Sequence, residues 1–185
     1  MGLAEWLGYG AQDVRAVGVA GLLHDLGKVN IPKEILNKPG KFDEREREIM
    51  KAHPMDGART ILTSDQQLDL AAAVAYEHHI MINGGGYPSL RYPRDCHFAS
   101  KLVHVCDVYD ALRTKRPYRD SWPAKKVLAY VEERSGTEFD GAIAHAFTAM
   151  MEHWEPRLAT LDGDETSPAT QQSPAPTDQA PEPPK

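Results

Sequence analysis

Long apolar runs and an excess of basic residues are both absent from this 185-residue sequence. No apolar run approaches the ~20 residues that cross a bilayer as a helix, and no signal peptide opens the sequence, so we expect no membrane span. Lys and Arg total 21 against 27 Asp and Glu, which gives a net charge of −6. This balance argues against binding of nucleic acid polymers through a basic face, although a local anion pocket remains compatible with it.

Cysteine is scarce as well. Cys96 and Cys106 are the only two cysteines, and neither belongs to a CxxC or CxxH pair. We therefore expect reduced, structural thiols and a cytoplasmic location rather than a zinc or redox role. What the chain does contain, 41% hydrophobic and 26% charged residues, is typical of a soluble globular protein. The length suffices for one well-cored domain and is too short for two large ones.

The C-terminal part, 157–185, differs from the rest in composition. It is rich in Pro, Ala, Ser, Thr and Gln and contains almost no residue suited to a core. Such a segment cannot bury enough apolar surface to offset the entropy lost on ordering. We therefore predict a disordered tail over 157–185 and one folded domain over 1–156.

The hydrophobic pattern of the folded part is helical throughout. Apolar residues recur at three- and four-residue spacing, and no segment alternates convincingly with the two-residue period of a strand. We predict an all-α bundle of six or seven helices, over 11–27, 41–53, 54–62, 64–79, 98–116, 121–136 and 140–154.

Polar side chains that can cap a helix precede four of these segments. The expected caps are Asp43, Ser64 or Asp65, Ser121 and Asp140. Asp43 is followed three residues later by Glu46, which is the spacing of a capping box. Pro54 ends the segment before it and can open the next helix.

The residues that can carry chemistry begin with His24 and Asp25, which are adjacent near the end of the first predicted helix. Neighbouring side chains on a helix project about 100° apart. One metal can bind both, or the carboxylate can bridge two metals while the imidazole binds one. The pair alone is weak support, because a histidine near a helix end often has only a structural role.

Four more residues extend this pair into a candidate cluster. His53 ends one predicted helix, and His78 and His79 end another. Asp107 lies inside an apolar helix, where a buried carboxylate needs a partner. Converging in a bundle core, these side chains would form a mixed nitrogen–oxygen site that suits iron, manganese, nickel or zinc better than calcium or magnesium. The spacing alone leaves metal ligation and plain packing equally open.

The remaining four histidines are assigned elsewhere. His97, His145 and His153 follow no pattern, and we expect them at the surface or in packing. His104 precedes Asp107 by one turn. We assign His104 to packing rather than to a place beside the metal ligands.

Five segments of the sequence, taken in order, resemble one protein family. They are "HDLGK" (24–28), "IPKEILNKPGKF" (31–42), "KAHPMDGARTIL" (51–62), "HH" with "NGGGYP" (78–79 and 83–88) and "VCDVYDALRTKRPYR" (105–119). This series resembles the HD-GYP family, a branch of the HD phosphohydrolase superfamily, and the resemblance covers about 10–150. It implies an all-α domain with a centre of two or three divalent metals, often iron or manganese. It also implies hydrolysis of the bacterial second messenger cyclic di-GMP to pGpG or GMP.

The resemblance also implies roles for individual residues. By motif match the metal ligands are His24, Asp25, His53, His78, His79 and Asp107. Asp25 is the bridging carboxylate and takes part in catalysis, since two metals activate water and bind phosphodiester oxygens. Lys28 is the second catalytic candidate and can reach a phosphate, although a lysine there also complements the dipole of a helix end. The substrate-binding candidates are Lys28, Lys101, Gly85, Gly86, Tyr87 and Arg116.

These substrate-binding candidates have separate rationales. Gly85 and Gly86 allow positive φ and a close approach of the backbone to a ligand, with an ordinary flexible loop as the alternative. Tyr87 offers a ring and a hydroxyl to a base or a partner. Lys101 stands where the family commonly has Arg and lacks the bidentate fork of Arg. Arg116 belongs to a basic cluster that can steer an anionic substrate.

Two features depart from the family pattern. Ile80 stands where the family typically has Glu, and the 23 residues before His24 lack the histidine that a further family helix carries. They keep two alternatives open: a catalytically weak module that binds ligand or partner proteins, and an HD phosphohydrolase that acts on another nucleotide. The resemblance also implies control by an upstream sensory or receiver domain or by a GGDEF-type protein.

Overall fold

The computed structural model describes residues 1–64, 68–89, 95–116 and 119–161 of the chain. Over this part the regular structure is helical, so the predicted all-α class is confirmed. The elements are α1 (Gly2–Trp6), α2 (Ala11–Leu23), the 3₁₀ helix η1 (Leu26–Asn30), α3 (Lys33–Leu36), α4 (Glu44–Met50), α5 (His53–Ser64), α6 (Asp69–Glu77), α7 (Phe98–Arg113), α8 (Ala124–Glu133) and α9 (Gly141–Leu161). No helix within the described ranges is long and apolar enough to cross a membrane.

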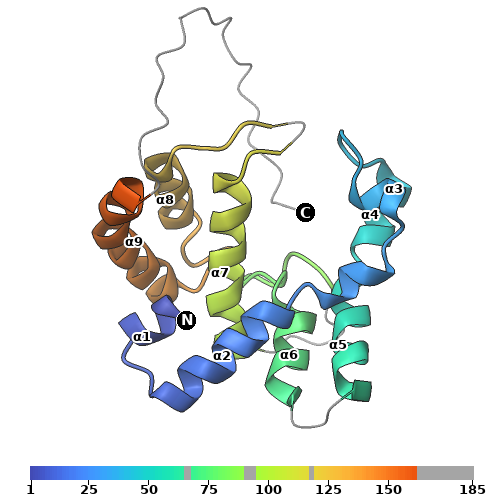
Figure 1. The fold of residues 1–185 in the computed structure, drawn as a ribbon, viewed down its shortest axis with the longest axis horizontal. Helices are drawn as coiled ribbons and strands as arrows, with labels where there is room; N and C mark the ends of the chain where they lie inside the picture. The colour runs from blue at the N-terminus through green and yellow to red at the C-terminus, as the bar shows by residue number, and fades with distance from the viewer. Residues whose placement is uncertain (65–67, 90–94, 117–118, 162–185) are drawn as a thin grey trace, which may run out of the picture.

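The long helix α7 is the central element of the bundle (Figure 1). Helices α8 and α9 pack on one side of α7, α2 and α6 contact it on the other, and α5 covers α6. The core between these helices consists mainly of apolar side chains with little or no exposure, among them Val74, Val105, Val108, Val127, Val131 and Phe147. Burial of each such side chain stabilises the fold by about 1.5–3 kcal/mol. The packed helices therefore provide a rigid frame for the residues at their ends.

Two predicted helix caps are confirmed. Asp43 accepts a hydrogen bond from the backbone N–H of Glu46 at 2.9 Å, and Glu46 accepts one from the backbone N–H of Asp43 at 2.8 Å, so the capping box of α4 is complete. The carboxylate of Asp140 accepts from the backbone N–H groups of Ala142 at 3.1 Å and Ile143 at 3.3 Å, at the start of α9. In both cases a local sequence signal was sufficient because the cap contacts are local.

Helix α2 ends at Leu23, four residues before its predicted end, and η1 follows it. The position of Gly27 explains this difference. A Cβ atom on Gly27 would lie 1.9 Å from the carbonyl oxygen of His53 and 2.6 Å from the backbone nitrogen of Gly57. The chain therefore changes to a tighter helix whose bare backbone packs against α5. As a result His24 is the C-cap of α2, and Asp25 lies in the bend between the two helices.

Two other caps were predicted wrongly or lie outside the structure. Helix α8 begins after Pro123 and has no side-chain cap, so Ser121 does not cap it. Proline fixes φ, which is −58° here, and so restricts the backbone at the helix start without a side-chain bond. Ser64 is the last residue of α5, and α6 begins after Leu68 without a side-chain cap. Asp65 lies outside the described residues.

Helix α9 runs to Leu161. The backbone of 157–161, which belongs to the predicted tail, is therefore helical. The rest of the predicted tail, 162–185, lies outside the described residues, and its disorder stays a prediction.

Candidate metal centre

The structure brings all six predicted ligands together. They form two groups of potential metal-ligand atoms, and within each group these atoms lie no more than 4.8 Å apart. One group consists of Asp25, His53, His78 and His79, and the other of His24, Asp25 and Asp107. Asp25 belongs to both groups, as expected for a bridging carboxylate.

Helix ends carry most of this cluster. His24 is the C-cap of α2, His53 is the first residue of α5, and His78 is the C-cap of α6. Asp107 comes from the middle of α7. The close packing of Gly27 on α5 brings Asp25 to His53, with Oδ1 of Asp25 3.3 Å from Nε2 of His53. The residues are therefore far apart in sequence but are held by elements that pack directly on one another.

The two carboxylate oxygens of Asp25 face different neighbours. Oδ1 lies 3.3 Å from Nε2 of His53 and 3.8 Å from Nε2 of His78. Oδ2 lies 3.4 Å from Nε2 of His24, which is in turn 3.6 Å from Oδ1 of Asp107. The other oxygen of Asp107 lies 3.9 Å from Nδ1 of His79. Each oxygen of Asp25 can thus serve a separate metal position.

Backbone carbonyls fix the orientation of three imidazoles. Nδ1 of His24, His53 and His78 each lies within hydrogen-bond distance of a carbonyl oxygen three residues earlier. These oxygens belong to Gly21, Met50 and Ala75, at 2.6, 2.8 and 2.9 Å. Because a carbonyl can only accept, Nδ1 is the donor, and in the neutral ring the lone pair is on Nε2. Nε2 is the atom that faces the cluster, so the rings are oriented as metal ligands require.

Three buried polar atoms of the cluster lack a hydrogen-bond partner: Nε2 of His24, Oδ1 of Asp25 and Nε2 of His79. Buried polar atoms in this condition are costly unless another group satisfies them. Imidazole nitrogens and carboxylate oxygens in this mixture suit a divalent transition metal. The residues present therefore fit such a metal.

The charges of the cluster are uneven in the metal-free protein. Burial lowers the pKa of His24, but its contacts with Asp107 and Asp25 outweigh burial and raise that pKa to about 10. Burial, together with the neighbouring His24 and His53, lowers the pKa of His78 to about 3. Burial raises the pKa of Asp25, but its contacts with His24 and His53 hold it well below its usual range. At neutral pH the cluster therefore contains a protonated His24 beside ionised carboxylates and a neutral His78.

Lys28 lies at the edge of the cluster. Lys28 belongs to the following helix η1, and its ammonium donates to Oδ2 of Asp25 at a distance of 2.5 Å. Its side chain remains 28% exposed, so it can also meet a ligand that approaches from solvent. This placement supports its predicted contact with a phosphate, which stays a prediction.

The glycine-rich loop closes over His79. Gly86 has a φ of +80°, and a Cβ atom there would lie 2.0 Å from the carbonyl oxygen of His79. The backbone N–H of Tyr87 donates to the same oxygen at 3.2 Å. The ring of Tyr87 packs 4.6 Å from the ring of His79, and its buried hydroxyl has no hydrogen-bond partner. Gly85 lies in a turn in which its N–H donates to Oδ1 of Asn83 at 2.8 Å. Gly86 and Tyr87 thus adjoin the cluster, whereas Gly85 lies farther along the loop.

The other two predicted substrate contacts lie outside the cluster. Lys101 lies on α7, six residues before Asp107. Its Nζ is 2.8 Å from a carboxylate oxygen of Asp95 and 3.4 Å from one of Asp140. Six helical residues correspond to roughly 9 Å. Arg116 follows the end of α7, where its backbone N–H donates to the carbonyl of Arg119 at 2.8 Å. Neither side chain contacts the six-residue cluster within the part of the chain that the structure describes, so their roles stay predictions.

His104 is buried and packs against the ring of Phe139, as its assignment to packing predicts, but the sequence did not indicate its hydrogen bond. Its Nδ1 donates to the carbonyl oxygen of His78 at 2.7 Å, so it directly supports a candidate ligand. The available signal was its position one turn before Asp107 on the same helix. Ile80 is also buried, and it pairs with Gly86 across the loop, so an apolar side chain is packed where the family typically has Glu.

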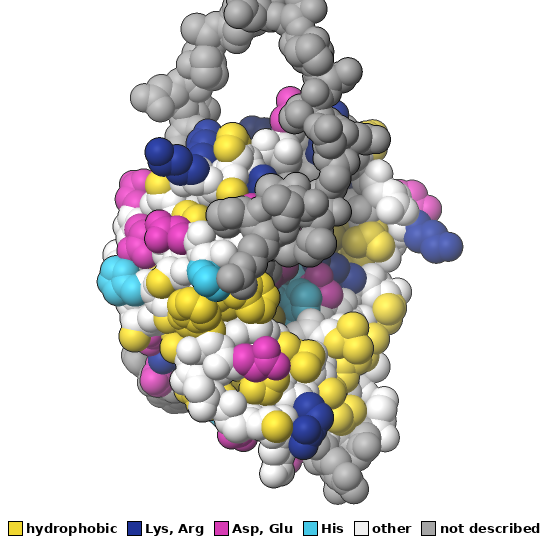
Figure 2. Space-filling model, turned by 60° about the vertical axis from the view of Figure 1, so that its left-hand side comes forward, with side chains coloured by type: hydrophobic (Ala, Val, Ile, Leu, Met, Phe, Trp, Pro, Cys, Tyr) yellow, Lys and Arg dark blue, Asp and Glu magenta, His cyan; other side chains and the backbone are white. Residues whose placement is uncertain are grey.

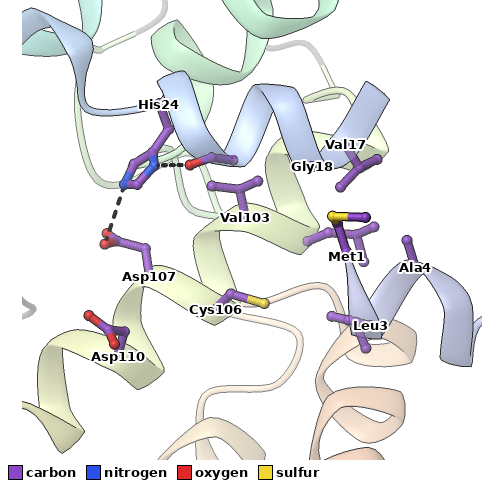
Figure 3. Close-up of a pocket in the computed structure, with 12 residues that line it drawn as sticks. Met1, Leu3, Ala4, Val17, Gly18, His24, Val103, Cys106, Asp107 and Asp110 are labelled. Carbon is purple, nitrogen blue, oxygen red and sulfur yellow. Dashed lines mark hydrogen bonds and ion pairs between the residues drawn. The ribbon is translucent and has the colours of Figure 1, made fainter. Parts of the chain in front are cut away.

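A cavity of about 320 Å³ adjoins the cluster between α2 and α7. In Figure 3, His24 and Asp107 point toward each other across one end of it, with Asp110 beside them. Met1 and Leu3 of the N-terminal segment line the opposite, apolar end. Figure 2 shows histidine, acidic and basic side chains together in a hollow that hydrophobic side chains border. The cluster therefore has space beside it for a ligand with an apolar part.

Comparisons with known proteins agree with this site. The family model described as "HD domain" matches residues 2–143. The chain is 40% identical over 134 residues to the cyclic di-GMP phosphodiesterase PA4108 of Pseudomonas aeruginosa, covering 72% of this chain and 32% of that protein. It is 37% identical over 139 residues to the cyclic di-GMP phosphodiesterase response regulator RpfG of Xanthomonas campestris, covering 75% and 37%. It is 32% identical over 158 residues to the 3'3'-cGAMP-specific phosphodiesterase 2 of Vibrio cholerae, covering 85% and 30%. The chain thus spans about a third of the length of these relatives.

Proposed function

Because this chain belongs to the HD domain family, and is of the HD-GYP type within it, we propose that it is a metal-dependent phosphodiesterase. We further propose that it hydrolyses cyclic di-GMP to pGpG or GMP in second-messenger signalling. The observation that carries this proposal is the carboxylate of Asp25, whose two oxygens face two separate groups of ligand atoms. The names of the relatives support the choice of substrate.

An HD domain implies binding of divalent metal, and the cluster can hold one. We propose two metal positions that share Asp25. His53, His78 and His79 would complete one position, and His24 with Asp107 would complete the other. Iron or manganese is the proposed metal, since both suit a nitrogen–oxygen donor set. A third metal would need ligands beyond these six residues.

Divalent metals bound by these residues would supply Lewis-acid charge and a water of lowered pKa for attack on the phosphodiester. The chain's own contribution is geometry. Asp25 would contribute one carboxylate oxygen to each proposed position, and the backbone carbonyls hold the imidazoles of His24, His53 and His78 in their orientation. The Lys28 ammonium adds positive charge next to Asp25, where it can stabilise the charge that develops on the phosphate oxygens.

The space around the cluster supports a substrate larger than phosphate. The cavity beside His24 and Asp107 can receive a part of the substrate beyond the scissile bond. Tyr87 and Gly86 border the cluster on the side of His79, and we propose that they complete the site there. Lys101 and Arg116 stay candidates for contacts at a greater distance.

We also propose a cytoplasmic location and control by a sensory or receiver domain or a GGDEF-type protein. The scarcity of cysteine and the lack of a CxxC or CxxH pair support a reducing compartment. The response regulator among the relatives supports the idea of signal control.

A weakly active binding module is the second candidate function, and the burial of Ile80 favours it. A hydrolysis assay separates the two candidates. Manganese- or iron-loaded protein is incubated under reducing conditions with cyclic di-GMP, 3'3'-cGAMP and a generic phosphodiester, and the products are separated by chromatography. The phosphodiesterase proposal predicts pGpG or GMP from cyclic di-GMP, and loss of this product in the double variant His24→Ala, Asp25→Ala. Metal-loaded protein that binds cyclic di-GMP without cleaving it would establish the binding module instead.

A further inference from the structure

A row of three buried polar side chains lies behind the candidate metal centre. His104 comes from α7, Tyr130 from α8, and Glu138 from the connection between α8 and α9. The hydroxyl of Tyr130 donates to Oε2 of Glu138 at 2.9 Å, and Oε1 of Glu138 lies 3.9 Å from Nε2 of His104. Nδ1 of His104 donates to the carbonyl oxygen of His78 at 2.7 Å. The row therefore runs from the second half of the bundle to a candidate metal ligand.

The hydrogen bond from His104 fixes a helix end. His78 is the C-cap of α6, and the carbonyl groups at a helix C-terminus have no partner within the helix. His104 supplies that partner from a different helix. Because His78 and His79 are adjacent, fixing the carbonyl between them constrains the backbone from which both imidazoles project.

The segment that contains Glu138 also holds the glycine-rich loop. The backbone N–H of Ile82 donates to the carbonyl of Glu138 at 3.2 Å, and the N–H of Asn83 donates to the carbonyl of Thr137 at 3.0 Å. The loop returns to His79 at its other end, through the N–H of Tyr87. One short segment thus holds the start of the loop, while Glu138 faces His104 beneath it.

The polarity of this row is not needed for packing. Nε2 of His104 and Oε1 of Glu138 are both buried and without a hydrogen-bond partner, which makes the pair costly. Apolar residues of similar volume often fill such a space at equal or higher stability. A role in positioning explains why polar side chains occupy this buried place, whereas a role in packing alone does not.

We propose that His104 and Glu138 are positioning residues that hold the His78–His79 turn and the loop 81–87 in the arrangement that binds metal. The inference rests on the metal site of the proposed function and is independent of the substrate. The two properties that depend on these residues are the affinity for metal and the order of the loop 81–87.

The test compares three variants with the parent protein. His104→Leu removes both ring nitrogens, and His104→Asn keeps a donor close to the position of Nδ1. Val105→Ala removes apolar volume from the same helix and leaves the bond from His104 to His78 in place. Mn²⁺ is titrated into metal-free protein, and thermal unfolding reports whether each variant is folded. Supporting groups next to metal ligands typically affect metal affinity about 10- to 100-fold, so His104→Leu is expected to weaken Mn²⁺ binding by that factor. His104→Asn should recover most of this loss, and Val105→Ala should bind Mn²⁺ like the parent although it unfolds at a lower temperature.

A second measurement addresses the loop in metal-free protein. Glu138→Ala should accelerate amide hydrogen exchange at Ile82 and Asn83 and should weaken Mn²⁺ binding. A folded His104→Leu variant with parental Mn²⁺ affinity, or with a loss no larger than that of Val105→Ala, would overturn the proposal. If His104→Leu does not fold, the other two variants decide. The proposal is contradicted if His104→Asn loses Mn²⁺ affinity by the full factor expected for His104→Leu. It is also contradicted if Glu138→Ala keeps both the Mn²⁺ affinity and the amide exchange rates of the parent. A parent protein that binds no Mn²⁺ refutes the metal site, and the exchange rates then still test the hold on the loop.

Discussion

Oδ1 of Asp25 lies 3.3 Å from Nε2 of His53, a contact between a helix bend and the first residue of a helix 28 positions later in the chain. Gly27 makes this contact possible, because any side chain there would collide with the backbone of α5. The opposite oxygen of Asp25 faces His24. A single carboxylate thus connects two groups of potential ligands, and the predictions below depend on this connection.

Removal of the shared charge should disable both metal positions. Asp25→Asn keeps the size of the side chain but cannot bridge two cations as a carboxylate does. We expect hydrolysis of cyclic di-GMP to fall by at least about 10²-fold, the usual effect of removing one stabilising group from a reaction centre. Steady-state kinetics checks this outcome. Asp120→Asn, which alters a highly exposed carboxylate paired with Lys115, is the matched control and should leave the rate unchanged.

Metal binding at pH 7 should release a proton from His24. The pKa of His24 is raised to about 10, so below that pH the metal-free protein holds this proton, whereas the lowered pKa of His78 leaves that ring neutral. A metal ligand must be neutral imidazole, and coordination therefore displaces the proton. Titration calorimetry in buffers with different ionisation enthalpies counts the protons released. The parent should release about one proton more than His24→Asn, and equal counts for the two proteins would contradict the prediction.

Substitution of two glycines in one loop tests whether the close approach of the loop backbone to His79 matters. Gly84 and Gly86 both have positive φ, but only Gly86 has a backbone atom in the way of a Cβ. Gly84→Ala should cost about 1–2 kcal/mol of stability from backbone strain alone. Gly86→Ala should lose a further ~1–3 kcal/mol from the collision, and it should also weaken Mn²⁺ binding through His79. Chemical denaturation and metal titration measure these effects, and equal losses in both variants would show that the close approach is unimportant.

Lys28 should raise the rate of hydrolysis without raising the affinity for metal. Its ammonium adds positive charge beside Asp25, so it assists a phosphate but repels a metal cation. Lys28→Met should lower kcat by about 10²-fold and leave metal binding unchanged or slightly tighter. Lys126→Met, which alters an exposed lysine of α8 that lies over the ring of Trp122, is the control and should leave both kcat and metal binding unchanged. If Lys28→Met lost metal and activity together, its role would be structural.

The sequence was sufficient for the parts of the site that depend on type and order of residues. The six candidate ligands could be named because histidines and aspartates stand at helix ends or within apolar helices, in the order of a known family. In the structure the packing of the helices brings these six side chains together. The caps at Asp43 and Asp140 were predictable because their contacts span three residues or fewer.

The support behind the ligands could not be read in the same way. His104, Glu138 and Tyr130 meet only through the packing of α7 against α8, which no local pattern encodes. The early end of α2 likewise depends on a contact between Gly27 and α5, which are separated in sequence by a loop and two short helices. Both misses concern contacts between distant segments, for which single-sequence periodicity contains no signal.

The number of metal ions bound per chain tests the central claim most directly. Protein loaded with manganese or iron without oxygen, freed of excess metal and measured by elemental analysis should contain two metal ions per chain. His24→Ala should retain the ion held by His53, His78 and His79, and Asp25→Ala should retain neither at full affinity. A parent protein that binds one ion or none under these conditions, or an Asp25→Ala variant that still binds two, would contradict a metal pair bridged by Asp25.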